Sequence, residues 1–156
     1  MIDFGGEDLV LVKEFRASPS ELYRAWSEPE ELAGWMGPPS VDVHLVEVDL
    51  RPGGAYRIVM RFPEGVEYSW GGRYLELNPP TRLAFTVEFW GEDGKLNREN
   101  PTQITVSFEA VGDKTRMTFR QSPFPPGVDR EGHADGWIAA FEKLAGFLEA
   151  AGRVSA

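Results

Sequence analysis

Residues 132–151 constrain the fold most, because they form the longest segment with a helical apolar period. At 100° per residue, one face of this segment carries large apolar side chains: Ala134, Trp137, Phe141, Leu144, Leu148 and Ala151, flanked by Ile138 and Phe147. Asp129 suits a helix start, and Gly152 suits a helix end. A helix of about 20 residues is about 30 Å long. Its aromatic face therefore needs a broad apolar surface beneath it.

The preceding residues predict a sheet that supplies this surface. Alternating or strand-rich apolar segments occupy residues 9–16, 41–50, 56–62, 67–77, 83–89, 104–108 and 117–119. Between the first two, Ser18 and Glu21 form a capping box that starts one short helix at Pro19, and Pro29 opens a second that runs to Trp35. This order predicts an α+β domain in which a curved antiparallel sheet of about seven strands grips the long helix.

Two strands change the phase of their apolar residues partway along. In the strand at residues 41–50 the change predicts a bulge near Leu45 and Val46. In the strand at residues 67–77 the two phases lie on either side of Gly71 and Gly72, which predicts a kink at these glycines.

Composition excludes several classes of function. The 156 residues predict one domain, with a core at about 9–151, and the net charge of −9 disfavours nucleic acid and anionic membranes as partners. The absence of cysteine excludes disulfides and thiolate sites. No apolar run reaches the length of a membrane span, and residues 1–10 lack the features of a signal peptide, so we expect a cytoplasmic protein.

Several short motifs, in order along the chain, carry a resemblance to a known family. They are Ala17-Ser18-Pro19, Tyr23, Ala25-Trp26, Pro29, Trp35-Met36-Gly37-Pro38, Asp49-Leu50-Arg51-Pro52-Gly53-Gly54, Gly72, Tyr74-Leu75-Glu76, Pro79-Pro80, Gly136-Trp137, Phe141, Leu144 and Leu148. Their order and spacing resemble those of single-domain proteins similar to the activator of the heat-shock protein 90 ATPase. The resemblance covers residues 9–149 and extends to the SRPBCC superfamily, which includes the START lipid-transfer domains.

This resemblance implies a helix-grip fold, with a hydrophobic cavity between the sheet and the long helix. The leading expectation is a domain that binds a hydrophobic small molecule, such as a lipid or a polyketide-like compound. One alternative is a chaperone-associated module that stimulates an ATPase. In the eukaryotic activator, however, an additional N-terminal domain does much of the chaperone binding, and we expect no counterpart here. A second alternative is a cyclase or hydrolase-like enzyme that acts on aromatic or polyketide substrates.

The inward strand phases and the long helix supply the candidate ligand-binding residues. They are Tyr56, Met60, Phe85, Phe89, Phe119, Trp137 and Phe141, and the resemblance adds Trp35 and Met36 at the cavity rim. Aromatic stripes more often fill a core than line a site, so the same residues also fit a solid interior. The sequence leaves both interpretations open.

Titratable groups give weaker candidates. His133 lies about 40° from Trp137 at the helix N-terminus, where the dipole would lower its pKa, so it is a candidate general acid or base, or else a solvated first-turn residue. His44 lies on the outward phase of its strand. Four arginines are outward or ambiguous, and they could pair with the surplus carboxylates or orient an anionic ligand: Arg57, Arg61, Arg73 and Arg120.

Motifs of other chemistries are missing from the sequence. There is no Walker loop, dinucleotide fingerprint or nucleophile elbow, and the two histidines are too far apart to dominate a metal site. We therefore expect no metal and no cofactor, and a binding protein more than an enzyme. Monomer and homodimer are equally compatible with the sequence.

Overall fold

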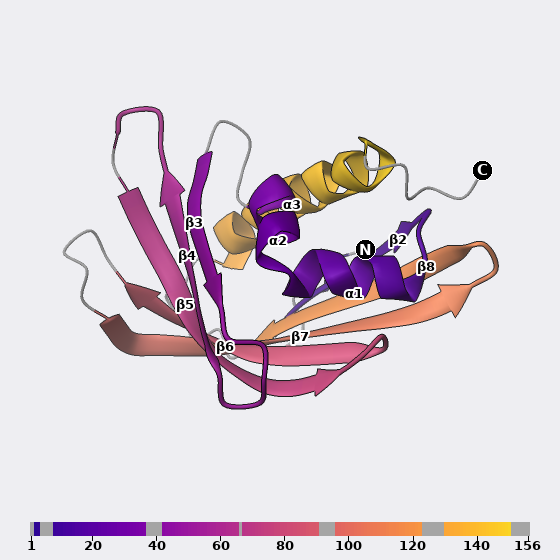
Figure 1. Ribbon diagram of the computed structural model, residues 1–156, viewed down its shortest axis with the longest axis horizontal. Coiled ribbons are helices and arrows are strands. Elements are labelled where there is room, and N and C mark those ends of the chain that lie inside the picture. The colour runs from indigo at the N-terminus through magenta and orange to yellow at the C-terminus, as the bar shows by residue number, and fades with distance from the viewer. Residues whose placement is uncertain are drawn as a thin grey trace.

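The fold is one curved antiparallel sheet with three helices, seen in a computed structural model that describes residues 2–3, 8–36, 42–65, 67–90, 96–122 and 130–150. The helices are α1 (Pro19–Ser27), α2 (Pro29–Trp35) and α3 (Arg130–Ala150). The strands are β1 (Ile2–Asp3), β2 (Leu9–Phe15), β3 (Asp42–Val48), β4 (Ala55–Arg61), β5 (Glu67–Asn78), β6 (Arg82–Trp90), β7 (Leu96–Val111) and β8 (Lys114–Ser122). In Figure 1 the sheet bends around all three helices, with α3 behind α1 and α2.

The eight strands lie in the order β1-β2-β8-β7-β6-β5-β4-β3, and every neighbouring pair is antiparallel. Strands β3 to β8 form a meander, and β2 joins it by pairing with β8. This arrangement confirms the predicted helix-grip fold, with two short helices after the long N-terminal strand. The one strand beyond the predicted seven is β1, which has only two residues.

The β-bulges differ in how well the sequence located them. The register of β3 on β4 shifts between Val43 and Leu45, next to the predicted position. The kink predicted at Gly71 and Gly72 is not where β5 changes phase. The register against β6 shifts instead between Tyr74 and Glu76. This bulge leaves Leu75 exposed and changes which residues of β5 point toward the core.

Gly71 and Gly72 have a different role, which is to let neighbouring strands approach closely. A Cβ atom at Gly71 would lie 2.2 Å from the carbonyl oxygen of Tyr56, and one at Gly72 would lie 2.2 Å from that of Thr86. No real Cβ contact is that short, so only glycine fits these two positions. The glycine pair therefore shapes the sheet directly beneath the two tyrosines, Tyr56 and Tyr74, described below.

Local sequence explains where the helices begin. The Ser18 hydroxyl accepts a hydrogen bond from the Glu21 backbone N–H at 3.2 Å, and Pro19 is the first residue of α1. Pro29 likewise opens α2. The predicted apolar face of α3 is confirmed at Ala134, Phe141, Leu144 and Leu148, which are all buried. The proposed caps of this helix, Asp129 and Gly152, and Ala151 lie outside the described residues.

Candidate functional site

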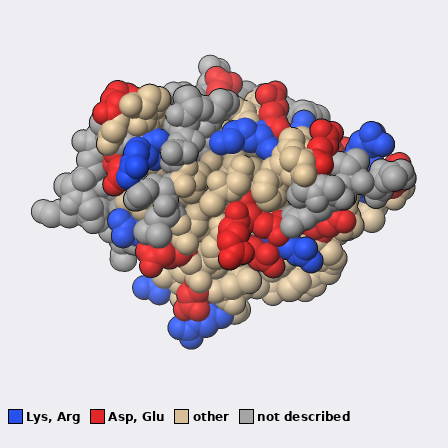
Figure 2. Space-filling view, turned by 45° about the horizontal axis from the view of Figure 1, so that its top comes forward, with Lys and Arg blue, Asp and Glu red and all other residues tan. Residues whose placement is uncertain are grey.

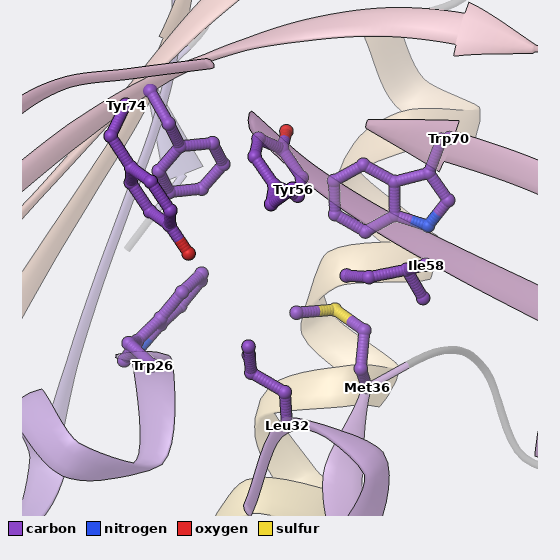
Figure 3. Close-up of a pocket in the computed structure, with 8 residues that line it drawn as sticks. Trp26, Leu32, Met36, Tyr56, Ile58, Trp70 and Tyr74 are labelled. Atoms are coloured by element: carbon purple, nitrogen blue, oxygen red, sulfur yellow. The ribbon is translucent and has the colours of Figure 1, made fainter. Parts of the chain in front are cut away.

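A narrow, partly open pocket lies between the two short helices and the concave face of the sheet. Its lining is apolar and aromatic: Trp26, Leu32, Met36, Tyr56, Ile58, Trp70, Tyr74 and Phe85. Figure 3 shows these side chains converging from α1, α2 and the strands opposite. The free volume is about 10 Å³, which is about what one water molecule needs. In this conformation the described side chains almost fill this pocket.

Trp26 on α1 is a large buried side chain at the centre of the described cluster of aromatic rings. It is 2% exposed, and its ring lies 4.8 Å from that of Trp35 and 6.0 Å from that of Trp137, measured between centroids. The rings of Phe85, Phe119 and Phe141 surround it at 6.1–6.3 Å. Its indole N–H donates to the Met117 sulfur at 3.2 Å. Trp26 thus links α1 to the sheet and to α3 through one cluster of rings.

Two tyrosines on neighbouring strands bring hydroxyl groups to this apolar region. The Tyr56 hydroxyl donates to the backbone carbonyl of Thr86 at 2.6 Å. The Tyr74 hydroxyl points into the pocket above Trp26 (Figure 3), and it forms no hydrogen bond with any residue that the structure describes. Tyr74 is only 3% exposed. Burial, with a smaller electrostatic contribution from Tyr23, raises the pKa of this phenol.

A buried polar chain lies beside the aromatic cluster, under α3. The Trp137 indole N–H donates to the side-chain oxygen of Gln121 at 3.1 Å, and the Gln121 amide donates to the Thr102 hydroxyl at 2.8 Å. Gln121 is 2% exposed on β8, at a position where the inward phase would normally place an apolar side chain. The chain fixes the orientation of the Trp137 ring against Phe119.

The structure separates the predicted ligand-binding residues whose side chains it describes into two groups. Met36, Tyr56 and Phe85 line the pocket. The other five belong to the surrounding core, where most of them pack against Trp26: Trp35, Phe119, Trp137, Phe141 and the half-buried Met60. The side chains of Phe89, His44 and His133 lie outside the described residues.

Sequence reasoning missed five of the pocket residues: Trp26, Leu32, Ile58, Trp70 and Tyr74. A signal existed for some of them, because Trp70 and Tyr74 share one strand phase, and Trp26 shares a helix face with Leu22. That phase shows which side chains point inward. It does not show which of them border free space.

The arginines proposed for cross-strand pairing mostly pair with carboxylates or carbonyls at the surface. Arg61 bonds Glu67 on the adjacent strand at 2.8 Å, Arg120 donates through Nε to Asp8 at 2.8 Å, and Arg73 donates to the Gly53 carbonyl at 3.2 Å. Figure 2 shows acidic and basic side chains interspersed over one face of the molecule. Arg57 is half-buried, opposite Glu47 in the register of β4 on β3. None of the four lines the pocket.

The described residues also limit other kinds of site. They contain no group of three or more His, Cys, Asp or Glu side chains placed to hold a metal ion. No helix in the described ranges has the length and apolar character to cross a membrane. The pocket lining includes no carboxylate, imidazole, ammonium or guanidinium group. Its surface is apolar apart from the hydroxyl groups of Tyr56 and Tyr74.

Comparison with solved structures supports the same architecture. Protein CV1439 from Chromobacterium violaceum is 26% identical, with a TM-score of 0.77, and the match covers 92% of this chain and 97% of that one. Protein NE0264 from Nitrosomonas europaea is 26% identical, with a TM-score of 0.78, covering 94% and 97%. The AHSA1 protein SPO3351 from Silicibacter pomeroyi is 25% identical, with a TM-score of 0.77, covering 91% and 97%.

The search of curated proteins finds no match. The scan of family models, in contrast, matches residues 16–149, which run from the end of β2 almost to the end of α3. The matched residues include all eight that line the pocket. With the eight-stranded sheet and its gripped helix, this match shows that the chain belongs to the family described as Activator of Hsp90 ATPase homolog 1-like protein, within the SRPBCC superfamily.

Proposed function

We propose that this protein binds a small apolar molecule in the pocket between α1, α2 and the sheet. The observation that carries the proposal is the lining itself, which joins residues of two helices and three strands into one partly open, apolar surface. Small-molecule sites are mostly apolar, with a few polar groups that orient the ligand. The Tyr74 hydroxyl is such a group.

Binding requires side chains to move, because the free volume of about 10 Å³ accommodates no more than about one water molecule. Met36 is the best suited to move, since methionine has three rotatable bonds and adapts to irregular spaces. It lies directly after α2, where the chain has left the helix. Repacking costs free energy, so we expect modest affinity for small rigid ligands.

The experiment is a thermal-shift and calorimetric titration with indane, naphthalene and decanol. We expect at least one of them to raise the melting temperature of the native protein, since a ligand that binds only the folded state stabilises it. Leu32→Phe should abolish this shift by filling the pocket from α2. The matched control is Leu75→Phe, the same change at an exposed residue on the outer surface, and it should leave the shift intact.

Two results would overturn the proposal. One is that none of the three compounds binds the native protein. The other is that Leu32→Phe binds them as well as Leu75→Phe does. Because overpacking a core typically costs about 1–3 kcal/mol, Leu32→Phe must first be shown to be folded by near-ultraviolet circular dichroism.

The family description favours a second candidate function, the stimulation of an Hsp90-type chaperone ATPase. The test adds this protein to the chaperone of the same organism and measures the rate of ATP hydrolysis. An unchanged rate at a several-fold molar excess would reject it. An acid–base enzyme is less well supported, because the pocket lining offers two phenols and no carboxylate or imidazole.

A further inference from the structure

We infer that the ligand of this pocket carries a neutral hydrogen-bond acceptor, such as a ketone or ether oxygen, that accepts from the Tyr74 hydroxyl. This inference rests on the proposed function and specifies its ligand class: a compact apolar skeleton with one acceptor oxygen placed opposite Tyr74.

The first argument is the contrast between two tyrosines in the same lining. Tyr56 lies on β4 and Tyr74 on the neighbouring β5, and the centroids of their rings are 5.5 Å apart. The Tyr56 hydroxyl already donates to the Thr86 carbonyl. The Tyr74 hydroxyl points into the pocket and has no partner among the described residues (Figure 3).

The second argument is where the Tyr74 hydroxyl can find a partner. It is not among the fully buried unpaired polar atoms of the described residues, so it keeps a small accessible surface, and hydroxyls in such places are usually paired with protein or with water. At 3% exposure, Tyr74 has access to little besides the pocket. The free volume beside it accommodates about one water molecule. A ligand oxygen in that place would supply the hydrogen bond that a water molecule could make there, and the rest of the ligand would displace Met36.

The third argument concerns the charge of the acceptor. The other lining residues are aromatic, aliphatic or, at Met36, a thioether, and no cation lies among them: Trp26, Leu32, Met36, Tyr56, Ile58, Trp70 and Phe85. A carboxylate or phosphate would be desolvated there without a countercharge, which is costly. Burial raises the pKa of the Tyr74 phenol, so it keeps its proton and remains a donor at neutral pH. A neutral acceptor is therefore the matching group.

The test compares indane with 1-indanone, which share a bicyclic skeleton and differ by one carbonyl oxygen. Calorimetry gives the ratio of their affinities for the native protein and for Tyr74→Phe. We expect the substitution to reduce the preference for 1-indanone about tenfold, the usual effect of one net hydrogen bond. Thr115→Val is the control, because it removes a buried hydroxyl outside the pocket lining, one that donates to the Ala17 carbonyl, and it should leave the ratio unchanged.

A second measurement on the native protein needs no substitution. The 13Cζ resonance of Tyr74 should shift on addition of 1-indanone more than on addition of indane. An affinity ratio that is the same in the native protein and in Tyr74→Phe would overturn the inference while leaving apolar binding intact. If naphthalene or decanol binds the native protein and neither indane nor 1-indanone does, this inference falls and the proposed function stands. Failure of all four compounds would overturn both.

Discussion

Tyr56 and Tyr74 place the same phenol group in two different environments, and this difference predicts unequal effects on stability. Tyr56→Phe removes the donor of a 2.6 Å hydrogen bond and leaves the Thr86 carbonyl without it, so we expect a loss of about 1–2 kcal/mol in the free energy of unfolding. Tyr74→Phe removes a hydroxyl that has no described partner, so we expect a change within about 0.5 kcal/mol. Urea unfolding measures both. Equal losses in the two variants would contradict the assignment.

We expect Trp26 to contribute strongly to stability, because its contacts join α1 to the sheet and to α3. Trp26→Ala should cost about 3–5 kcal/mol, because it leaves a cavity at the meeting point of five aromatic rings and removes the donor to Met117. Denaturant unfolding checks this value. A loss below about 1 kcal/mol would show that neighbouring rings collapse into the space, and that the cluster does not depend on Trp26.

For single residues, the sequence predicts whether a side chain points inward better than it predicts which groups that side chain contacts. Strand phase correctly predicted that Tyr56 and Phe85 face inward, and the same phase contained Tyr74. Whether a tyrosine hydroxyl has a partner depends on a carbonyl of another strand, here that of Thr86, which no local pattern reveals. Local spacing likewise predicts that Trp26 shares an apolar helix face with Leu22. It does not predict the contacts that Trp26 makes with the sheet and with α3.

Helices α2 and α3 pack closely at Gly34 but leave open space at Gly146, and a glycine-to-alanine substitution at each position tests this difference. A Cβ atom added at Gly146 on α3 would meet nothing within 4 Å, so Gly146→Ala should raise stability by about 0.5–1 kcal/mol through helix propensity. At Gly34 on α2 the added atom would lie 2.5 Å from the Phe147 ring of α3. Gly34→Ala should therefore lower the melting temperature. A rise in both variants would mean that α2 and α3 separate easily.

The elements themselves were predictable where chemistry acts over a few residues. Ser18 and Pro19 located the start of α1, and Pro29 located the start of α2. In β5 the sequence predicts a kink at Gly71 and Gly72, because glycine is the usual local signal, but the register shift lies between Tyr74 and Glu76. These glycines instead allow the close approach of two neighbouring strands, which is a constraint that comes from residues far along the chain.

The whole molecule should lose stability in alkali, and the buried tyrosines contribute to this. Burial raises the pKa of Tyr23 and Tyr74 above the ordinary value of 10.0, so the folded state holds these protons after the unfolded state has released them. Stability therefore falls as the pH rises above about 10, by up to about 1.4 kcal/mol per pH unit for each group. Unfolding in urea between about pH 8 and 11.5 should give a shallower decline for Tyr74→Phe. Parallel declines would show that Tyr74 ionises freely.

The architecture as a whole was predictable because the order of elements, and the length of the last helix, leave few ways to bury so much apolar surface. The state of the interior was not. Whether helix and sheet enclose open space depends on how side-chain volumes from three helices and the sheet add up. Here Trp26, from α1, packs against Phe119 of the sheet and Trp137 of α3, and so occupies space between them in the described part of the interior.

The pairing of β2 with β8 has a consequence for how the chain folds as it is made. The first long strand and the last strand lie side by side, with Leu9 opposite Gln121, and Trp26 reaches Met117. On the ribosome, β2 and α1 therefore emerge before β8. Trp26, which is buried in the folded protein, has no partner on β8 until residues beyond 114 are synthesised. Such contacts between distant parts of a chain form slowly and expose apolar surface meanwhile. A nascent chain that stops before β8 should remain unfolded and sensitive to protease, whatever the stability of the finished protein.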